Sequence, residues 1–468
     1  MSSFGLASSR DSRRPPLVGI GAVVAGGLAL SVAVINPLLL LAPAGLLLGL
    51  VVFRWPRQTL LVLLIGTPLA EIPFELLPQT HVSALRDVVL AAILVAFALR
   101  RLHQRRLELP ASPITAALLT FTAIVLLYMA IAPTPVQGLL GAKALIFYAA
   151  LYFLIPEYLT EERDFRILVF GLASCGAILA AYAVFSFLAP QSTFPFDPQG
   201  TGTQITDGVT RLHFAAYTVF FATMLPVTWW AAELLSGRRI TRAALGLVAI
   251  VQVAVIVVSG LRATWVAAAA VAMVNVGANV RRLAVVPLLA VVALVAVVLV
   301  GGDNTLVSRV ATTGSSGDIG FTGRLSELQN VWIPLISAHP LGLGTGTFTS
   351  TASSTWQSVV GTLQFSYLAK GVGHNGYLEI LAEQGIIGFA AYLALIGTVF
   401  GVLLNNQGRL TRPVLKAVNR LALGQVIGYS LLNFLMPAPI LFPVNVYFFV
   451  SAGLAVAVRR VEALPRTK

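Results

Sequence analysis

Apolar segments of about 20 residues recur from one end of the chain to the other, and each is long enough for a helix to cross a hydrocarbon layer about 30 Å thick. Of the 468 residues, 57% are hydrophobic and only 10% are charged, whereas ordinary soluble domains carry about 25% charged residues. These values exclude a single soluble core. The pattern therefore predicts an all-α polytopic membrane protein.

The apolar segments predict about 12–14 transmembrane helices, with 14 as the best count. The predicted spans are approximately 17–35, 37–53, 59–72, 86–99, 113–131, 140–159, 167–189, 213–235, 244–260, 263–279, 284–301, 384–405, 417–436 and 441–458.

Lysine and arginine residues gather in alternate connections between these spans. If the N-terminal arginines Arg10, Arg13 and Arg14 lie in the cytoplasm, 24 of the 31 basic residues fall on that side, as the positive-inside rule requires. Both termini are then cytoplasmic. Topology accounts for the net charge of +13, so we expect no nucleic-acid partner.

Two long connections fall on the outer side, at about residues 190–212 and 302–383. Loops of this length are usually functional or disordered. The second contains a helical pattern of apolar residues from Gly323 to Ala338, then a glycine-rich run, so we expect an ordered cap. The sequence thus divides into transmembrane helices at 1–301, an outer loop domain at 302–383 and further transmembrane helices at 384–468.

Groups that bind metals or nucleotides are scarce in the sequence. Cys175 is the only cysteine, and there is no Asp-x-Asp pair and no cluster of histidines. The short cytoplasmic connections leave no room for a nucleotide-binding strand-to-helix turn. We expect neither a cofactor nor a metal; the alternative left open is a divalent cation near Glu71, Glu75 and Asp87.

One motif closes the long outer loop. His374 and Asn375 are followed after nine residues by Gly385 and after two more by Gly388. This spacing resembles the signature of the bacterial O-antigen ligase and polymerase family, and the similarity is strong over about residues 320–390. The resemblance implies an all-helical, GT-C-like fold, as in other lipid-dependent glycosyltransferases, with His374 as the catalytic residue.

The residues of this motif suggest distinct roles. A neutral imidazole at His374 can take a proton from an attacking sugar hydroxyl, because histidine has an unperturbed pKa of about 6.5. Asn375 supports it, and Tyr377 either orients it, binds sugar or belongs to the membrane-interface aromatic belt. Glu379 and Glu383, four residues apart, are either paired carboxylates for acid and base chemistry or structural groups that hold the loop by pairing with outer arginines.

Arginines at outer helix ends are the candidates for binding a diphosphate. Arg211, Arg262 and Arg324 carry a permanent charge on a fork of donors that suits phosphate oxygens. Snorkelling or a salt bridge is the alternative for each. Lys143 could extend the positive pocket. In the family a serine precedes the arginine that corresponds to Arg262, whereas this chain has Leu261 at that position.

These features favour a membrane glycosyltransferase of the bacterial inner membrane, multi-pass, with its active site on the periplasmic face. The resemblance implies an O-antigen ligase in lipopolysaccharide biosynthesis, which transfers a glycan from a polyprenyl (undecaprenyl) diphosphate to a lipid A core sugar, with inversion and without metal. A polymerase using the same donor and another glycan as acceptor is one alternative. An oligosaccharyltransferase acting on protein hydroxyls and a polysaccharide transporter without chemistry are the others.

Overall fold

The structure is a computed structural model of the chain. It describes residues 49–70, 82–105, 109–188, 203–206, 209–212, 215–234, 239–258, 262–276, 324–325, 327–348, 375–439 and 443–465. The predicted spans at 17–35 and 284–301 lie outside these residues, and so does most of the span at 37–53.

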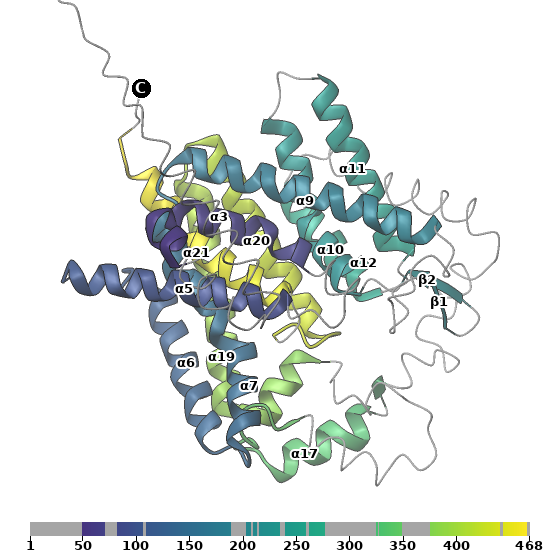
Figure 1. The fold of residues 1–468 in the computed structure, drawn as a ribbon. Coiled ribbons are helices and arrows are strands. Elements are labelled where there is room, and N and C mark those ends of the chain that lie inside the picture. Colours follow the sequence, from purple (N-terminus) through teal and green to yellow (C-terminus); the bar gives the residue numbers. More distant parts are fainter. Residues whose placement is uncertain are drawn as a thin grey trace, which may run out of the picture.

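The described part of the chain is predominantly helical (Figure 1). In its N-terminal half the helices are α3 (Pro56–Gly66), η2 (Thr67–Ala70), α5 (Val82–His103), α6 (Pro113–Ala130), α7 (Pro135–Ile146), η3 (Phe147–Ala149), α8 (Ala150–Tyr158) and α9 (Glu162–Leu188). They are followed by α10 (Ala215–Leu234), α11 (Arg239–Val258), α12 (Arg262–Val276), η5 (Leu328–Trp332), α17 (Ile333–Ala338), α19 (Gly376–Arg409), α20 (Pro413–Asn433) and α21 (Val444–Glu462).

Six helical segments among the described residues are long and apolar enough to cross a membrane. They are Pro113–Ala130, Pro135–Tyr158, Glu162–Phe185, Arg239–Val257, Gly376–Arg409 and Val444–Glu462. The chain is thus a multi-pass helical membrane protein. The total of 14 spans and the GT-C-like fold stay predictions.

Helix starts follow from local sequence. Pro113 occupies the first turn of α6, where its missing N–H costs no hydrogen bond, and the Ser112 hydroxyl accepts a hydrogen bond from the N–H of Ile114. Pro135 and Pro413 occupy the same place in α7 and α20. Pro56 and Pro334 do so in α3 and α17, so proline marks the entry into five of the described helices.

The strands β1 (Thr203–Thr206) and β2 (Val209–Leu212) form an antiparallel hairpin, in which Gln204 lies opposite Arg211. The sequence predicted a helix beginning near Arg211. The helix α10 instead begins at Ala215, and Arg211 belongs to a strand. The hairpin contacts α11.

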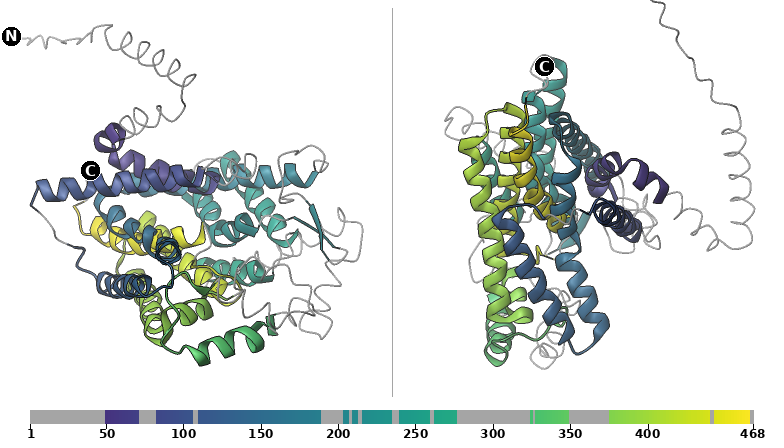
Figure 2. Two further views of the ribbon diagram at one scale, coloured as in Figure 1. Left: turned by 60° about the horizontal axis from the view of Figure 1, so that its bottom comes forward. Right: turned by 90° about the vertical axis from the view of Figure 1, so that its left-hand side faces the viewer.

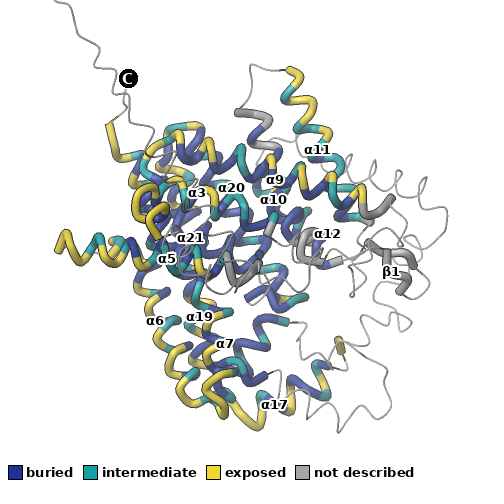
Figure 3. Tube along the Cα trace, viewed as in Figure 1, coloured by how far each residue is buried: buried dark blue, intermediate teal, exposed yellow. Residues whose placement is uncertain are grey.

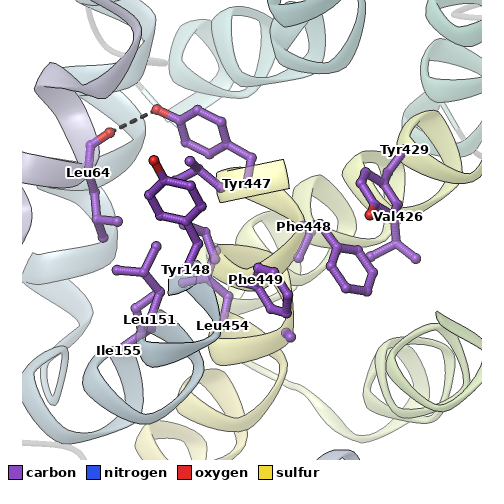
Figure 4. Packing of buried hydrophobic residues seen from close by; sticks show 14 of the residues in the cluster. Leu64, Tyr148, Leu151, Ile155, Val426, Tyr429, Tyr447, Phe448, Phe449 and Leu454 are labelled. Atoms are coloured by element: carbon purple, nitrogen blue, oxygen red, sulfur yellow. Dashed lines mark hydrogen bonds between the residues drawn. The ribbon is translucent and has the colours of Figure 1, made fainter. Parts of the chain in front are cut away.

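Helices α20 and α21 pack against each other, and around them α8 packs on α21 while α10, α12 and α19 pack on α20. Helix α6 runs alongside α19, as Figure 1 and the right view of Figure 2 show. Figure 4 shows the apolar packing between α8 and α21. There the Tyr447 hydroxyl donates a 2.8 Å hydrogen bond to the carbonyl of Leu64, and the rings of Tyr429 and Phe448 stack with centroids 4.4 Å apart.

An ion-pair cluster joins α3 to the turn before α9. The buried carboxylate of Asp164 accepts hydrogen bonds from the backbone N–H groups of Thr160 (3.1 Å) and Glu161 (3.0 Å) and from Nε of Arg57 (2.6 Å). The guanidinium of Arg57 also binds Glu161 and, through that hydrogen bond, lowers the pKa of the Glu161 carboxyl. Asp164 therefore ties the turn and α3 together.

Replacing Asp164 with Ala is expected to destabilise the protein by about 2–3 kcal/mol, because two backbone donors and a half-buried guanidinium lose their acceptor. Thermal unfolding in detergent measures this as a lower midpoint. Glu161→Ala is the matched control: Glu161 binds the same arginine but is solvent exposed, so its loss should matter far less. Equal effects of the two substitutions would contradict the role of Asp164.

Candidate functional site

We define residues 339–348 as the strap, which connects α17 to the C-terminal end of α6 and to the first turns of α19. Two of its backbone N–H groups donate hydrogen bonds to α19. The N–H of Leu343 donates to the carbonyl of Ala382 (3.0 Å), and that of Gly344 donates to the carbonyl of Glu383 (2.9 Å). In Figure 1 α17 lies at the bottom, beneath the ends of these two helices. The glycine-rich run of the sequence is therefore an ordered junction.

The strap also binds α6. The N–H of Thr345 donates to the carbonyl of Tyr128 (3.1 Å), and its hydroxyl donates to the carbonyl of Val125 (3.2 Å). In return, the hydroxyl of Tyr128 donates to the carbonyl of Leu341. The carbonyl of Tyr128 is one of the last four of α6, which helix geometry leaves without an intrahelical donor.

Glu383 lies at the centre of this junction. Its side chain is buried, and its two oxygens accept hydrogen bonds from the backbone N–H groups of Gly346 (2.9 Å) and Phe348 (3.0 Å). One interpretation of the sequence was that Glu383 holds the loop by an ion pair with an arginine. It does hold the loop, but its hydrogen-bond partners among the described residues are backbone amides and Gln384.

Close backbone contacts explain two glycines of the junction. Gly385 has φ 64° and ψ −170°, which produces a kink in α19, and a Cβ there would lie 2.3 Å from the carbonyl carbon of Leu341. Gly346 has φ 78°, and a Cβ would lie 2.2 Å from the carbonyl oxygen of Gln137. Only glycine fits either position without strain.

The segment before the strap has a small apolar core. The ring of Trp332 stacks on that of Phe348 with centroids 4.2 Å apart, and Val331, Leu335 and Ala382 complete the cluster. The helical pattern predicted for Gly323 to Ala338 is confirmed where the structure describes it, with a π-helical turn in η5 followed by α17.

His374 itself lies outside the described residues, but the next residue defines where α19 begins. Asn375 is the N-cap: its side-chain oxygen accepts a hydrogen bond from the N–H of Leu378 (3.0 Å). Its amide group donates to the carbonyl of Phe434 at the end of α20 (3.2 Å). The helix start is thereby fixed against a neighbouring helix.

Tyr377 and Glu379 both point into the protein. The hydroxyl of Tyr377 donates a hydrogen bond to the carbonyl of Ser430 in α20 (3.0 Å), so this donor already has a partner in the protein. Glu379 is 7% exposed, and its Oε2 atom has no hydrogen-bond partner among the described residues. A buried carboxyl oxygen without a donor is costly, which makes Glu379 the unusual group at this end of α19.

The three candidate arginines lie on separate elements. Arg211 is in β2, Arg262 is the first residue of α12, and Arg324 is an exposed residue in a helical turn ahead of η5. Helix α11 contacts both β2 and α12, so the backbones that carry Arg211 and Arg262 meet the same helix. The side chains of these two residues are outside the described part of the structure.

Lys143 belongs to a different cluster. Its Nζ lies 2.6 Å from Asp87, whose other oxygen lies 3.2 Å from Nε of Arg86 and accepts a 3.0 Å hydrogen bond from the hydroxyl of Tyr148. Lys143, which the sequence offered as an extension of the positive pocket, thus shares the carboxylate of Asp87 with Arg86. Sequence patterns gave no sign of Tyr148, an aromatic residue in an apolar helix.

The cation alternative at Glu71, Glu75 and Asp87 gains no support from the described residues. Both oxygens of Asp87 already have partners, and Glu71 and Glu75 lie outside the described residues. Within the ranges that the structure covers, no group of three or more His, Cys, Asp or Glu side chains could hold a metal ion.

The fold and this junction define a multi-pass helical membrane protein in which an ordered segment between two helices is bound to the helix ends by hydrogen bonds. Residues 245–393 match the family model described as O-antigen ligase, a stretch that includes α12, the strap and the kink of α19. This stretch is similar to the family, and the resemblance inferred from the histidine motif is confirmed. No curated protein matches the chain.

Proposed function

We propose that the protein is an O-antigen ligase that transfers a glycan from a polyprenyl diphosphate to a sugar of the lipid A core. The observation that supports this most is the family match, because residues 245–393 contain both Arg262 and His374. The match supports an enzyme of the ligase or polymerase type acting on a lipid-linked glycan. Donor, acceptor and mechanism belong to the proposal.

In this mechanism the donor is already activated, because a diphosphate is a good leaving group. His374 takes the proton of the acceptor hydroxyl, the oxygen forms a bond to the anomeric carbon, and the bond from that carbon to the diphosphate breaks with its electrons on the diphosphate. Arg211, Arg262 and Arg324 bind the diphosphate and stabilise the developing charge. Direct displacement inverts the anomeric carbon, and no metal is required.

Helix-capping geometry suggests what supports His374. At helix starts, a hydrophobic residue before the N-cap often packs against one at the fourth helical position, so these two positions are close enough for their side chains to meet. With Asn375 as N-cap, these residues are His374 and Glu379. The buried Oε2 of Glu379, which has no hydrogen-bond partner among the described residues, is suited to accept a hydrogen bond from the imidazole and to stabilise its protonated form.

Replacing Glu379 with Gln is expected to shift the acid limb of the pH–rate profile to lower pH. The carboxylate favours the protonated imidazole, so its removal lets the base lose its proton at lower pH, while kcat falls about tenfold or more through lost orientation. Tyr377→Phe is the matched control, since it removes only the hydrogen bond to Ser430. If Glu379→Gln lowers kcat but leaves the profile unmoved, the role is structural.

The site would lie on the periplasmic face of the bacterial inner membrane, with both termini in the cytoplasm. This orientation rests on the distribution of basic residues. A polymerase remains the second candidate, because the matched family accommodates a ligase or polymerase type of enzyme. The two activities differ in the acceptor.

A transfer assay with purified protein tests the proposal. Polyprenyl-diphosphate glycan is offered with lipid A core in the presence of EDTA, and the products are separated by mass. Glycan attached to the lipid A core supports the ligase. Lengthened lipid-linked glycan with unmodified core identifies a polymerase, and a requirement for added divalent cation contradicts the metal-independent mechanism.

A further inference from the structure

Three segments that meet at the outer end of the protein are free of charged residues. They are the corner between α6 and α7 (residues 126–141), the segment from α17 into the strap (333–341) and α19 just beyond its kink (384–395). The strap holds them together, since it binds α6 and α19 through the hydrogen bonds described above. The glycine contacts at Gly141 and Gly346 bring α7 to the same place.

The exposed side of these segments is mostly apolar, and its exposed polar residues are Thr134, Ser337 and His339. Leu341 is 65% exposed beside Ile386, which is 61% exposed, and the N–H of Ile386 donates to the carbonyl of Pro340. Ile333 of α17 is 53% exposed. The large exposed apolar side chains of the corner are Leu126, Leu127, Ile131, Val136, Leu139 and Leu140.

This apolar surface continues the side of α6 and α19 that faces lipid. Exposed leucines follow both helices, Leu119 and Leu126 on α6 and Leu393 and Leu404 on α19. In Figure 3 the exposed positions of α6 and α7 extend down to the end of the molecule where α17 lies. A loop helix in water usually carries charged residues on its outer face, whereas residues 333–341 include no Asp, Glu, Lys or Arg and expose only Ser337 and His339 among polar side chains.

We propose that residues 333–341 and the α6–α7 corner lie in the outer leaflet of the bilayer, with their exposed side chains in contact with lipid acyl chains. The cap over the outer face is then anchored in the membrane at its base. Backbone groups at that depth must be satisfied within the protein, and the hydrogen bonds of the strap do this for the corner and the kink. This inference concerns location and does not depend on the proposed chemistry, although the choice of the outer leaflet rests on the proposed orientation.

Spin labels in proteoliposomes test this placement. In a Cys175→Ala background, a nitroxide is attached after Ile333→Cys or Leu341→Cys, and its collisions with oxygen and with a water-soluble nickel chelate are compared. Leu393→Cys on the lipid side of α19 is the bilayer control, and Gln329→Cys, an exposed polar position on η5, is the aqueous control. We expect the two test sites to match Leu393→Cys, with high oxygen and low nickel accessibility.

Two outcomes would overturn the proposal. Nickel accessibility as high as at Gln329→Cys would put the segment in water. Low accessibility to both reagents would mean that protein, such as a second copy of the chain, covers this surface. The thermal unfolding midpoint of each variant is first compared with that of the Cys175→Ala protein. Only variants with an unchanged midpoint are labelled, so that misfolding is not mistaken for either result.

Discussion

Replacement of His374 by Ala is expected to lower the rate of glycan transfer about 10²–10⁴-fold, the usual contribution of a general base. The acceptor hydroxyl would keep its proton until it attacks, while the diphosphate would still be bound and activated. KM for the lipid-linked donor should therefore change little. Single-turnover transfer at saturating donor measures the loss directly.

Arg262→Ala provides the contrasting result. Loss of a permanent charge on the diphosphate should raise KM for the donor as well as lower kcat, whereas Arg262→Lys should recover part of the activity because it restores the charge without the fork of donors. His374→Ala protein that transfers glycan at the wild-type rate would exclude the proposed mechanism. Equal effects of both substitutions on KM and kcat would instead mean that His374 contributes to donor binding.

The motif that identified the family also has a structural role, which spacing did not reveal. From the sequence, the positions after His374 suggested chemistry. In the structure Asn375 caps α19, Glu383 binds two backbone N–H groups of the strap and Gly385 forms the kink. Backbone amides occur at every residue except proline, so no residue pattern points to them as partners. This is why an arginine was the natural guess for Glu383.

Apolar periodicity predicted the long apolar helices better than it predicted the residues at which they begin. The span predicted at 384–405 begins at Gly376 in the structure, because a helical segment that contains two buried glutamates precedes the kink. A hydropathy argument treats such glutamates as loop residues. The helix start predicted near Arg211 was wrong for another reason. Arg211 lies in a strand of four residues, which is too short to give a periodic signal.

The alternation of basic connections remains a prediction about topology, although some of these residues have a second role in the structure. Arg57 binds Asp164, and Arg101 and Arg460 both pair with Glu157. Charge that orients a chain can thus also join helix ends. Sequence counting alone does not separate the two roles, since the partners lie far apart along the chain.

Replacement of Gly385 by Ala is expected to open the outer junction. The residue has φ 64° and ψ −170°, a conformation that costs other residues of order 1–3 kcal/mol, and the added Cβ would lie 2.3 Å from the backbone of Leu341. Either the kink straightens or the strap moves away. Limited proteolysis of detergent-solubilised protein should show faster cleavage near residues 339–348, together with a lower unfolding midpoint and reduced transfer.

Gly401→Ala is the matched control within the same helix. Nothing lies within 4 Å of a Cβ at this position, so the change should be neutral or stabilise α19 by up to about 1 kcal/mol through helix propensity. Glu383→Gln tests the other half of the junction. Its amide has one oxygen acceptor, so one of the N–H groups of Gly346 and Phe348 would face a donor, at a cost of about 1–3 kcal/mol. The junction requires that Gly385→Ala and Glu383→Gln both increase cleavage of the strap while Gly401→Ala does not. If Gly385→Ala behaved like Gly401→Ala, the strap would be held by contacts other than the kink.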